Sequence, residues 1–168
     1  AVFCAFIFDR EILDALPSAD DRRVEFIWDS VRELDAALRA RGGALIVRHG
    51  FARDAVPELA ATLEASAVYA NRDYEPAACG RDGAVAQALA ARGISLRTAK
   101  DRVIFECDEV LSQAGRPFSV FTPYKNAWLK KLEPHFLEEH AVQMDAANLA
   151  SVRDDVATPP PTLAQLGF

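Results

Sequence analysis

The sequence lacks paired cysteines, long apolar runs and an excess of positive charge. Its three cysteines are widely spaced and include no Cys-x-x-Cys pair, so they give no sign of zinc or redox chemistry and fit a reducing cytosol. No apolar run reaches the length of a membrane span, and no basic segment precedes an apolar one as in a signal peptide. The formal net charge of −6 gives no overall positive surface for a phosphate backbone. We therefore expect a cytoplasmic protein without a membrane partner or a metal site, in which this segment does not itself bind DNA.

The glycines and serines also lack the common catalytic and nucleotide-binding motifs. Gly42 and Gly43 follow an expected helix, and Gly80 and Gly83 lack the spacing of a phosphate-binding loop or a dinucleotide fingerprint. No GxSxG segment of a hydrolase occurs. If the fold is of the nucleotide-binding type, its ligand is of a different kind.

Apolar runs and helical patterns alternate at short spacing along the first hundred residues. The chain has 168 residues, half of them apolar, which suits one domain and a tail. We expect strands near residues 1–8, 44–48, 67–70 and 94–98, and helices near residues 22–41, 52–63, 82–91 and 124–132. This order predicts an α/β fold, a doubly wound Rossmann-like parallel sheet with helices on both faces. Because a protein seldom begins inside a core strand, we also expect residues upstream of Ala1.

Two of the expected helices carry apolar side chains at steps of three and four residues. In the first long helix, this spacing predicts one buried face made of Val24, Ile27, Trp28, Val31, Leu34 and Leu38. In the last helix it applies to Phe121, Tyr124 and Trp128. Base stacking is the alternative for these aromatics, but the spacing favours docking of the helix against the sheet.

Three loops follow expected strands and are candidates for a ligand site. Ligands of open parallel sheets bind beyond the carboxyl ends of the strands. The loops are residues 8–23, HGFAR at 49–53 and NRDYEP at 71–76. The third is the richest in polar groups, although polar residues after a strand are also ordinary loop chemistry.

Two longer segments resemble a known family. GRPFSVFTPYKNAWLKKL, at 115–132, resembles the segment that closes the antenna domain of class I photolyases, and VYANRDYEP, at 68–76, resembles their strand and loop. FDREIL and the long helix from Arg23 precede these segments in the same order. The chain is thus similar, over nearly its whole length, to the amino-terminal α/β domain of the DNA photolyase/cryptochrome family, closest to class I cyclobutane pyrimidine dimer photolyases.

The resemblance implies a domain organisation. The family's usual opening, an Arg-rich strand and the first helix, has no counterpart here, so the fold is expected to be truncated at the N-terminus. Residues 1–144 would form the antenna domain, and residues 145–168 a linker toward a helical FAD-binding domain that is absent. Since the absent strand is central in the family's sheet, its neighbours would pair directly, exchange a segment, or bind a partner, which includes an oligomer formed through the truncated sheet.

The resemblance also implies a pigment site. Phe8, Asp9, Arg23, Asp73 and Glu75 resemble positions of a deazaflavin-type antenna pocket. In this interpretation Phe8 packs on the ring, Arg23 holds an anionic oxygen and Asp73 accepts hydrogen bonds; alternatively, Arg23 and Asp73 merely pair with each other. An 8-hydroxy-deazaflavin is favoured, with methenyltetrahydrofolate, FMN and an empty pocket as alternatives. The residues that align with the folate-binding Asn and Glu of other members are Ala77 and Ala78, which speaks against folate.

The function implied is antenna-chromophore binding in a deoxyribodipyrimidine photolyase. In the family, excitation passes from the antenna to FAD in the helical domain, which repairs pyrimidine dimers in DNA and contacts that DNA. No catalytic residue is expected in this chain, which alone should be inactive. A cryptochrome photoreceptor and a generic small-ligand-binding α/β domain are the alternatives.

Overall fold

The computed structural model describes residues 1–139, 148–151, 156 and 159–168. Its four strands are β1 (Cys4–Asp9), β2 (Leu45–Gly50), β3 (Ala67–Asn71) and β4 (Ser95–Ala99). Its helices are α1 (Arg10–Leu13), α2 (Arg22–Arg39), α3 (Ala52–Thr62), α4 (Pro76–Ala90), α5 (Phe121–Lys131), α6 (Leu163–Leu166) and a short 3-10 helix, η1 (Pro134–Leu137). The expected alternation of strands and helices is confirmed.

The strands form two separate parallel pairs. Cys4 is opposite Leu45 in the β1–β2 pair, and Ala67 is opposite Ser95 in the β3–β4 pair. No ladder joins β1 to β3 within the part of the chain that the structure describes, so direct pairing of these neighbours is not observed. The mixed α/β architecture with parallel strands is as predicted, and its sheet is interrupted between β1 and β3.

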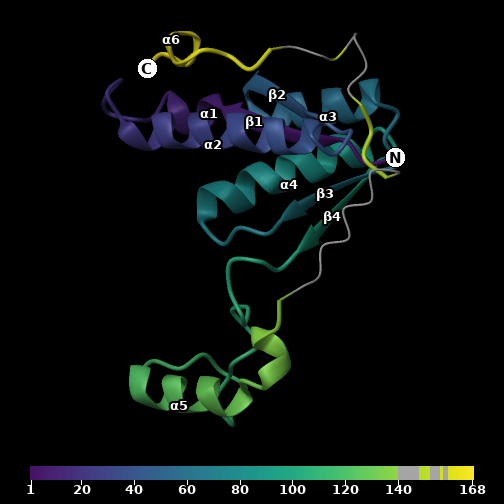
Figure 1. Ribbon diagram of the computed structural model, residues 1–168. Coiled ribbons are helices and arrows are strands. Elements are labelled where there is room, and N and C mark those ends of the chain that lie inside the picture. The colour runs from purple at the N-terminus through teal and green to yellow at the C-terminus, as the bar shows by residue number, and fades with distance from the viewer. Residues whose placement is uncertain (140–147, 152–155, 157–158) are drawn as a thin grey trace.

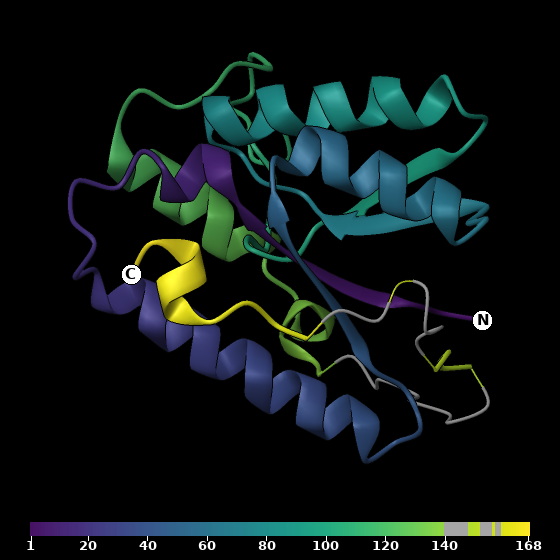
Figure 2. The same ribbon diagram turned by 90° about the horizontal axis from the view of Figure 1, so that it is seen from above.

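Helices cover the strands from two sides. Figure 2 shows α2 and α6 on one side of β1 and β2, and α3 and α4 on the other. Val24, Val31 and Leu166 pack with Phe8 and Val47 in the core on the α2 side. A second core around Leu89, which is fully buried, joins α3 and α4 to β3 and β4. The strands of each pair run parallel, and the carboxyl ends of β1, β2 and β3 lead into the starts of α1, α3 and α4.

The buried face of α2 is narrower than its sequence pattern predicts. Val24, Val31 and Leu38 are buried, as expected for a stripe repeating every seven residues. Ile27 and Leu34, however, are 42% and 45% exposed, so their predicted burial is wrong. Both lie at the margin of the stripe, where no neighbouring element covers them in the described residues.

Helix α3 begins where the sequence predicts, whereas α4 begins earlier than predicted. In α3, Pro57 lies inside the helix and is fully buried. Packing of a buried ring offsets the hydrogen bond that proline cannot donate. In α4, Pro76 occupies the first turn, where a missing N–H costs nothing, so the helix starts at Pro76 rather than near Asp82.

The segment with α5 forms a lobe of its own. Figure 1 shows α5 apart from both sheets, and the helix has no buried residue. Its Trp128 packs edge-to-face on Phe105, with ring centroids 5.4 Å apart, while Phe121 is 72% exposed. The predicted docking of this helix against the sheet is therefore wrong, because the loop that contains Phe105 provides the contact instead.

The described part of the C-terminal segment returns to the α/β core. Leu149 bridges to Val2 in parallel, Val156 is buried against Ile46, and Leu166 is buried beside α2. Residues 145–147, 152–155 and 157–158 of the expected linker lie outside the described residues. Among the described residues, no helix combines the length and apolar character needed to span a membrane.

Candidate functional site at the carboxyl ends of the strands

Phe8 and Asp9 end β1, where the first loop begins. Phe8 is 2% exposed and packs edge-to-face on Phe6, with ring centroids 5.0 Å apart. Phe8 belongs to the hydrophobic core beneath the candidate site. It presents almost no surface to a ligand, so the predicted packing of its ring on a chromophore is not supported.

Asp9 is the one buried charged or polar residue recorded in the described core, at 6% exposure. Its Oδ1 accepts hydrogen bonds from the backbone N–H groups of Glu11, at 3.1 Å, and Ala52, at 3.2 Å. It thereby joins the starts of α1 and α3. Its Oδ2 is buried without a hydrogen-bond partner among the described residues. A buried carboxylate oxygen without a donor is costly, which makes this atom a natural acceptor for a ligand N–H or O–H.

Arg23 lies in the first turn of α2 and pairs locally. Its guanidinium group donates to both carboxylate oxygens of Asp21, the N-cap residue of that helix. Hydrogen bonds from the Arg23 side chain and backbone hold the pKa of Asp21 at about 2. The Arg23 side chain is 75% exposed. The alternative in which Arg23 merely pairs with Asp73 is wrong, because each has a different partner.

Asp73 lies in the loop between β3 and α4. Its Oδ1 accepts from the backbone N–H groups of Tyr74, at 2.7 Å, and Glu75, at 3.3 Å. Its Oδ2 lies 2.6 Å from Nη1 of Arg102, which follows β4. The backbone hydrogen bonds, and then the charge of Arg102, lower the pKa of Asp73. Glu75 is the N-cap residue of α4, but its exposed side chain makes no capping hydrogen bond.

The segment after β4, which was not predicted as part of the site, supplies several partners to this loop. Besides Arg102, it contains Glu106, whose Oε1 accepts from Arg72 and from the Tyr74 hydroxyl. Burial, and then the hydrogen bond to Glu106, raises the pKa of Tyr74. The available signal was the dense charge of residues 100–109, since the loop after β4 opens at the same edge of the fold as the loop after β3.

The second predicted loop contributes an aromatic ring that contacts two guanidinium groups. Phe51, at the start of α3, lies 5.2 Å from the Arg10 guanidinium and 5.0 Å from that of Arg53. Such contacts stabilise a cation over an aromatic face. This cluster lies beside Ala52, whose N–H reaches Asp9, so the first and second loops meet.

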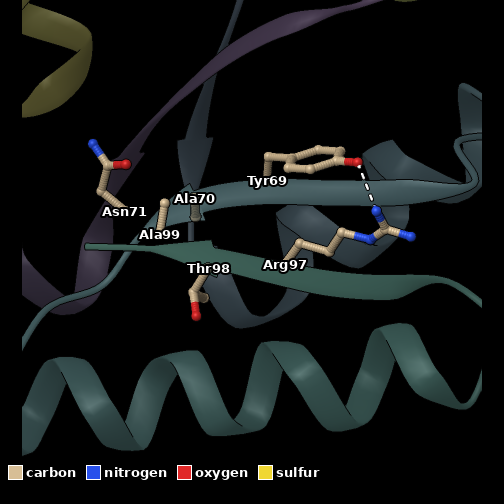
Figure 3. Close-up of a pocket in the computed structure, with 6 residues that line it drawn as sticks. All are labelled: Tyr69, Ala70, Asn71, Arg97, Thr98 and Ala99. Atoms are coloured by element: carbon tan, nitrogen blue, oxygen red, sulfur yellow. Dashed lines mark hydrogen bonds between the residues drawn. The ribbon is translucent and has the colours of Figure 1, made fainter. Parts of the chain in front are cut away.

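A shallow hollow of about 460 Å³ lies over the carboxyl halves of β3 and β4. Its lining is formed by Tyr69, Ala70, Asn71, Arg97, Thr98 and Ala99. Figure 3 shows the Tyr69 hydroxyl joined to the Arg97 guanidinium, at 3.2 Å. None of the five residues predicted for the pigment site lines it, although Asn71 leads directly into the loop that carries Asp73 and Glu75.

The arrangement offers groups that can bind a ligand. It combines a buried acceptor at Asp9, exposed guanidinium groups and aromatic surface at one edge of the strands. Within the described residues, no group of three or more His, Cys, Asp and Glu side chains could hold a metal ion. An aromatic ligand with hydrogen-bond donors and an anionic group matches these side chains.

Comparisons with known proteins identify the relatives of this chain. The family model described as DNA photolyase matches residues 1–146. A deoxyribodipyrimidine photo-lyase from Synechococcus is 33% identical over 165 residues, covering 97% of this chain and 34% of its own length. Cryptochrome-1 of Arabidopsis thaliana is 33% identical over 107 residues, which cover 61% of this chain and 15% of that protein.

Two solved structures share the fold. A bacterial class III photolyase from Agrobacterium tumefaciens superposes with a TM-score of 0.68 at 25% identity, covering 80% of this chain and 27% of that one. An archaeal photolyase from Sulfolobus tokodaii with two FAD molecules gives a TM-score of 0.60 at 28% identity, covering 74% and 27%. The chain thus spans about a third of the length of the Synechococcus relative. From the family match over residues 1–146, this chain belongs to the DNA photolyase family.

Proposed function

We propose that this chain is the antenna-chromophore-binding α/β domain of a light-driven deoxyribodipyrimidine photolyase. The observation that carries the proposal is the buried Asp9 Oδ2, which lacks a donor at the edge where parallel strands bind ligands. Family membership supports a pigment as the ligand.

In this proposal the predicted site residues have distinct roles. Asp9 accepts a hydrogen bond from the chromophore, and Phe8 supports the site from the core. Asp73 orients the loop and Arg102, and Glu75 offers an exposed carboxylate at the start of α4. Arg23 holds an anionic oxygen of the ligand with the donors that Asp21 leaves free, which suits its exposed side chain.

An 8-hydroxy-deazaflavin is the chromophore that we favour. It offers ring donors and an anionic oxygen to the groups just described. The positions expected to bind a folate are Ala77 and Ala78, whose methyl groups cannot form its hydrogen bonds. FMN remains the flavin alternative, and the second FAD of the Sulfolobus photolyase supports a flavin antenna in this fold.

The remaining parts of the reaction belong to the longer protein. Residues 145–168 would lead to a helical domain that holds FAD and contacts DNA. When bound there, reduced FAD supplies the electron that splits a pyrimidine dimer. Residues of this chain bind and orient the antenna pigment and exclude water from it, so the chain alone would repair no DNA. We place the protein in the cytoplasm, and an oligomer formed through the open edges of β1 and β3 is part of the proposal.

The pigment that accompanies the full-length protein tests this proposal. The protein would be purified from its own cells, and the released pigment would be characterised by absorption and mass spectrometry. We expect a deazaflavin in addition to FAD. A folate would overturn the pocket assigned here, and FAD alone from fully loaded protein would contradict an antenna function.

A cryptochrome photoreceptor is the second candidate function, favoured by the similarity to Cryptochrome-1. The two functions differ in whether the full-length protein repairs DNA. Full-length protein that splits pyrimidine dimers only under illumination would identify a photolyase, whereas flavin photoreduction without repair would identify a cryptochrome.

A further inference from the structure

Glu106 connects two loops at the candidate site. Its Oε1 accepts a hydrogen bond from Arg72 Nη1, at 2.5 Å, and another from the Tyr74 hydroxyl, at 2.9 Å. These two donors flank Asp73 in the sequence. The Glu106 side chain is 21% exposed and the Arg72 side chain 42% exposed, so the acceptor is the better shielded end of their ion pair. We call Arg72, Tyr74 and Glu106 the Glu106 clamp.

The two arms of the clamp differ in what else holds them. Arg72 is also tied to the end of β4, because its backbone N–H donates to Ala99 at 2.9 Å and its guanidinium group reaches Thr98 Oγ1 at 3.3 Å. For the Tyr74 side chain, the bond to Glu106 is the one hydrogen bond recorded among the described residues. Tyr74 is therefore the arm that depends most on Glu106.

Glu106 is itself held in place. Its backbone N–H donates to the carboxylate of Glu109, which also accepts from Lys100 Nζ at 2.7 Å. Lys131 of α5 donates to the backbone carbonyl of Glu109. The acceptor of the clamp therefore lies on a segment that has supporting contacts of its own.

We propose that Glu106 is a positioning residue: by holding Arg72 and Tyr74, it fixes the loop between β3 and α4. That loop carries Asp73 and Glu75, two of the proposed chromophore-binding residues. The effect on chromophore binding rests on the proposed function, whereas the effect on the loop does not. Charge-assisted bonds such as that between Glu106 and Arg72 are roughly twice as strong as neutral ones, which suits this role.

Three variants of the 168-residue chain test the clamp. Glu106→Ala removes the acceptor, and Glu106→Gln retains an acceptor of the same size without the charge. Glu58→Gln, on the exposed face of α3, is the matched control for loss of one carboxylate. Far-ultraviolet circular dichroism confirms that each variant is folded before comparison.

Three measurements distinguish an effect on the loop from an effect on ligand binding. Amide hydrogen exchange reports the order of residues 71–76. Ultraviolet titration, with Tyr74→Phe to identify its signal among the three tyrosines, reports the pKa of Tyr74. Fluorescence titration with 8-hydroxy-5-deazariboflavin reports binding.

For Glu106→Ala we expect at least tenfold faster exchange in residues 71–76, a lower pKa for Tyr74 and at least tenfold weaker binding of the probe. Glu106→Gln should lie between wild type and Glu106→Ala, and Glu58→Gln should match wild type. Unchanged exchange in Glu106→Ala would overturn the clamp, whatever happens to binding. Faster exchange with unchanged binding would also overturn the positioning role. If wild type binds no probe while Glu106→Ala loosens the loop, the proposed function fails and the clamp stands as a loop-fixing device.

Discussion

The indole N–H of Trp28 donates a hydrogen bond to the backbone carbonyl of Pro161, at 2.7 Å. The two residues are 133 positions apart, and the bond joins the middle of α2 to the C-terminal segment. This segment then forms α6, whose Leu166 enters the core beside Phe8. The floor of the candidate site therefore depends on a part of the chain that follows the last strand by about sixty residues.

Loss of the Trp28 hydrogen bond should weaken this attachment. Trp28→Phe retains an aromatic ring but removes the donor, so we expect the free energy of unfolding to fall by about 1 kcal/mol. Chemical denaturation measures the change. Phe26→Leu on the same helix is the control, because Phe26 is 73% exposed. Equal stability of Trp28→Phe and wild type would mean that the bond does not form in solution.

Truncation of the Leu166 side chain should lower the free energy of unfolding by more than Trp28→Phe does. Leu166 is 5% exposed, and Leu166→Ala leaves a cavity in the core, so we expect a loss of about 2–5 kcal/mol. Leu137→Ala removes the same atoms from a side chain that is 66% exposed and should change little. If the two variants unfold at the same denaturant concentration, the C-terminal segment is not part of the folded core.

Replacing either of two glycines with alanine should change the stability of the chain, in opposite directions for the two positions. Gly83 lies inside α4 with open space around it, so Gly83→Ala should stabilise the chain by about 0.5–1 kcal/mol. Gly93, after α4, has a φ of +73°, where a side chain is strained, so Gly93→Ala should destabilise it by about 1 kcal/mol. Thermal unfolding of both variants checks the signs. A stabilising Gly93→Ala would contradict the left-handed turn that ends α4.

The pair of Asp21 and Arg23 should make stability depend on pH in acid. The folded-state pKa of Asp21, about 2, lies below its ordinary value of 3.8. A depressed pKa stabilises the folded state above the unfolded pKa, so this contribution is present above a pH of about 4 and lost as the pH falls toward 2.

Asp21→Asn isolates this contribution, since asparagine still caps the helix but cannot form the ion pair. Between pH 4 and pH 2, the melting temperature of Asp21→Asn should fall less than that of wild type. Asp20→Asn, one residue earlier, is the control for loss of a neighbouring charge. Parallel acid profiles for wild type and Asp21→Asn would show that Arg23 does not hold Asp21 in solution.

Sequence patterns predicted the strands and helices well, because these elements depend mainly on the character of neighbouring residues in the chain. The apolar runs of β1 to β4 were recognised from side-chain character alone, and the glycines after α2 placed its end within a few residues. The exposure of Ile27 and Leu34 was not predictable in the same way. Periodicity identifies a candidate face, but the width of the buried stripe depends on which elements pack against it.

The candidate site was predicted only in part because its contacts are long-range. The position of Asp9 at the end of β1 follows from the strand itself. The partner of Asp73, in contrast, is Arg102, which lies 29 positions later. Sequence spacing cannot choose Arg102 over Arg23 as that partner. The break between the two strand pairs likewise depends on which edges meet in space.

A pigment that binds where the strands end should shift the backbone amide signals of the residues around it. The isotopically labelled chain would be titrated with 8-hydroxy-5-deazariboflavin while its backbone amide signals are followed. We predict that the amides of Asp9, Ala52 and Asp73 shift together, and that those of Gly43 and Ile94, before β2 and β4, stay in place. Shifts confined to Gly43 and Ile94, or no shifts at saturating pigment, would show that the pigment does not bind at the carboxyl ends of the strands.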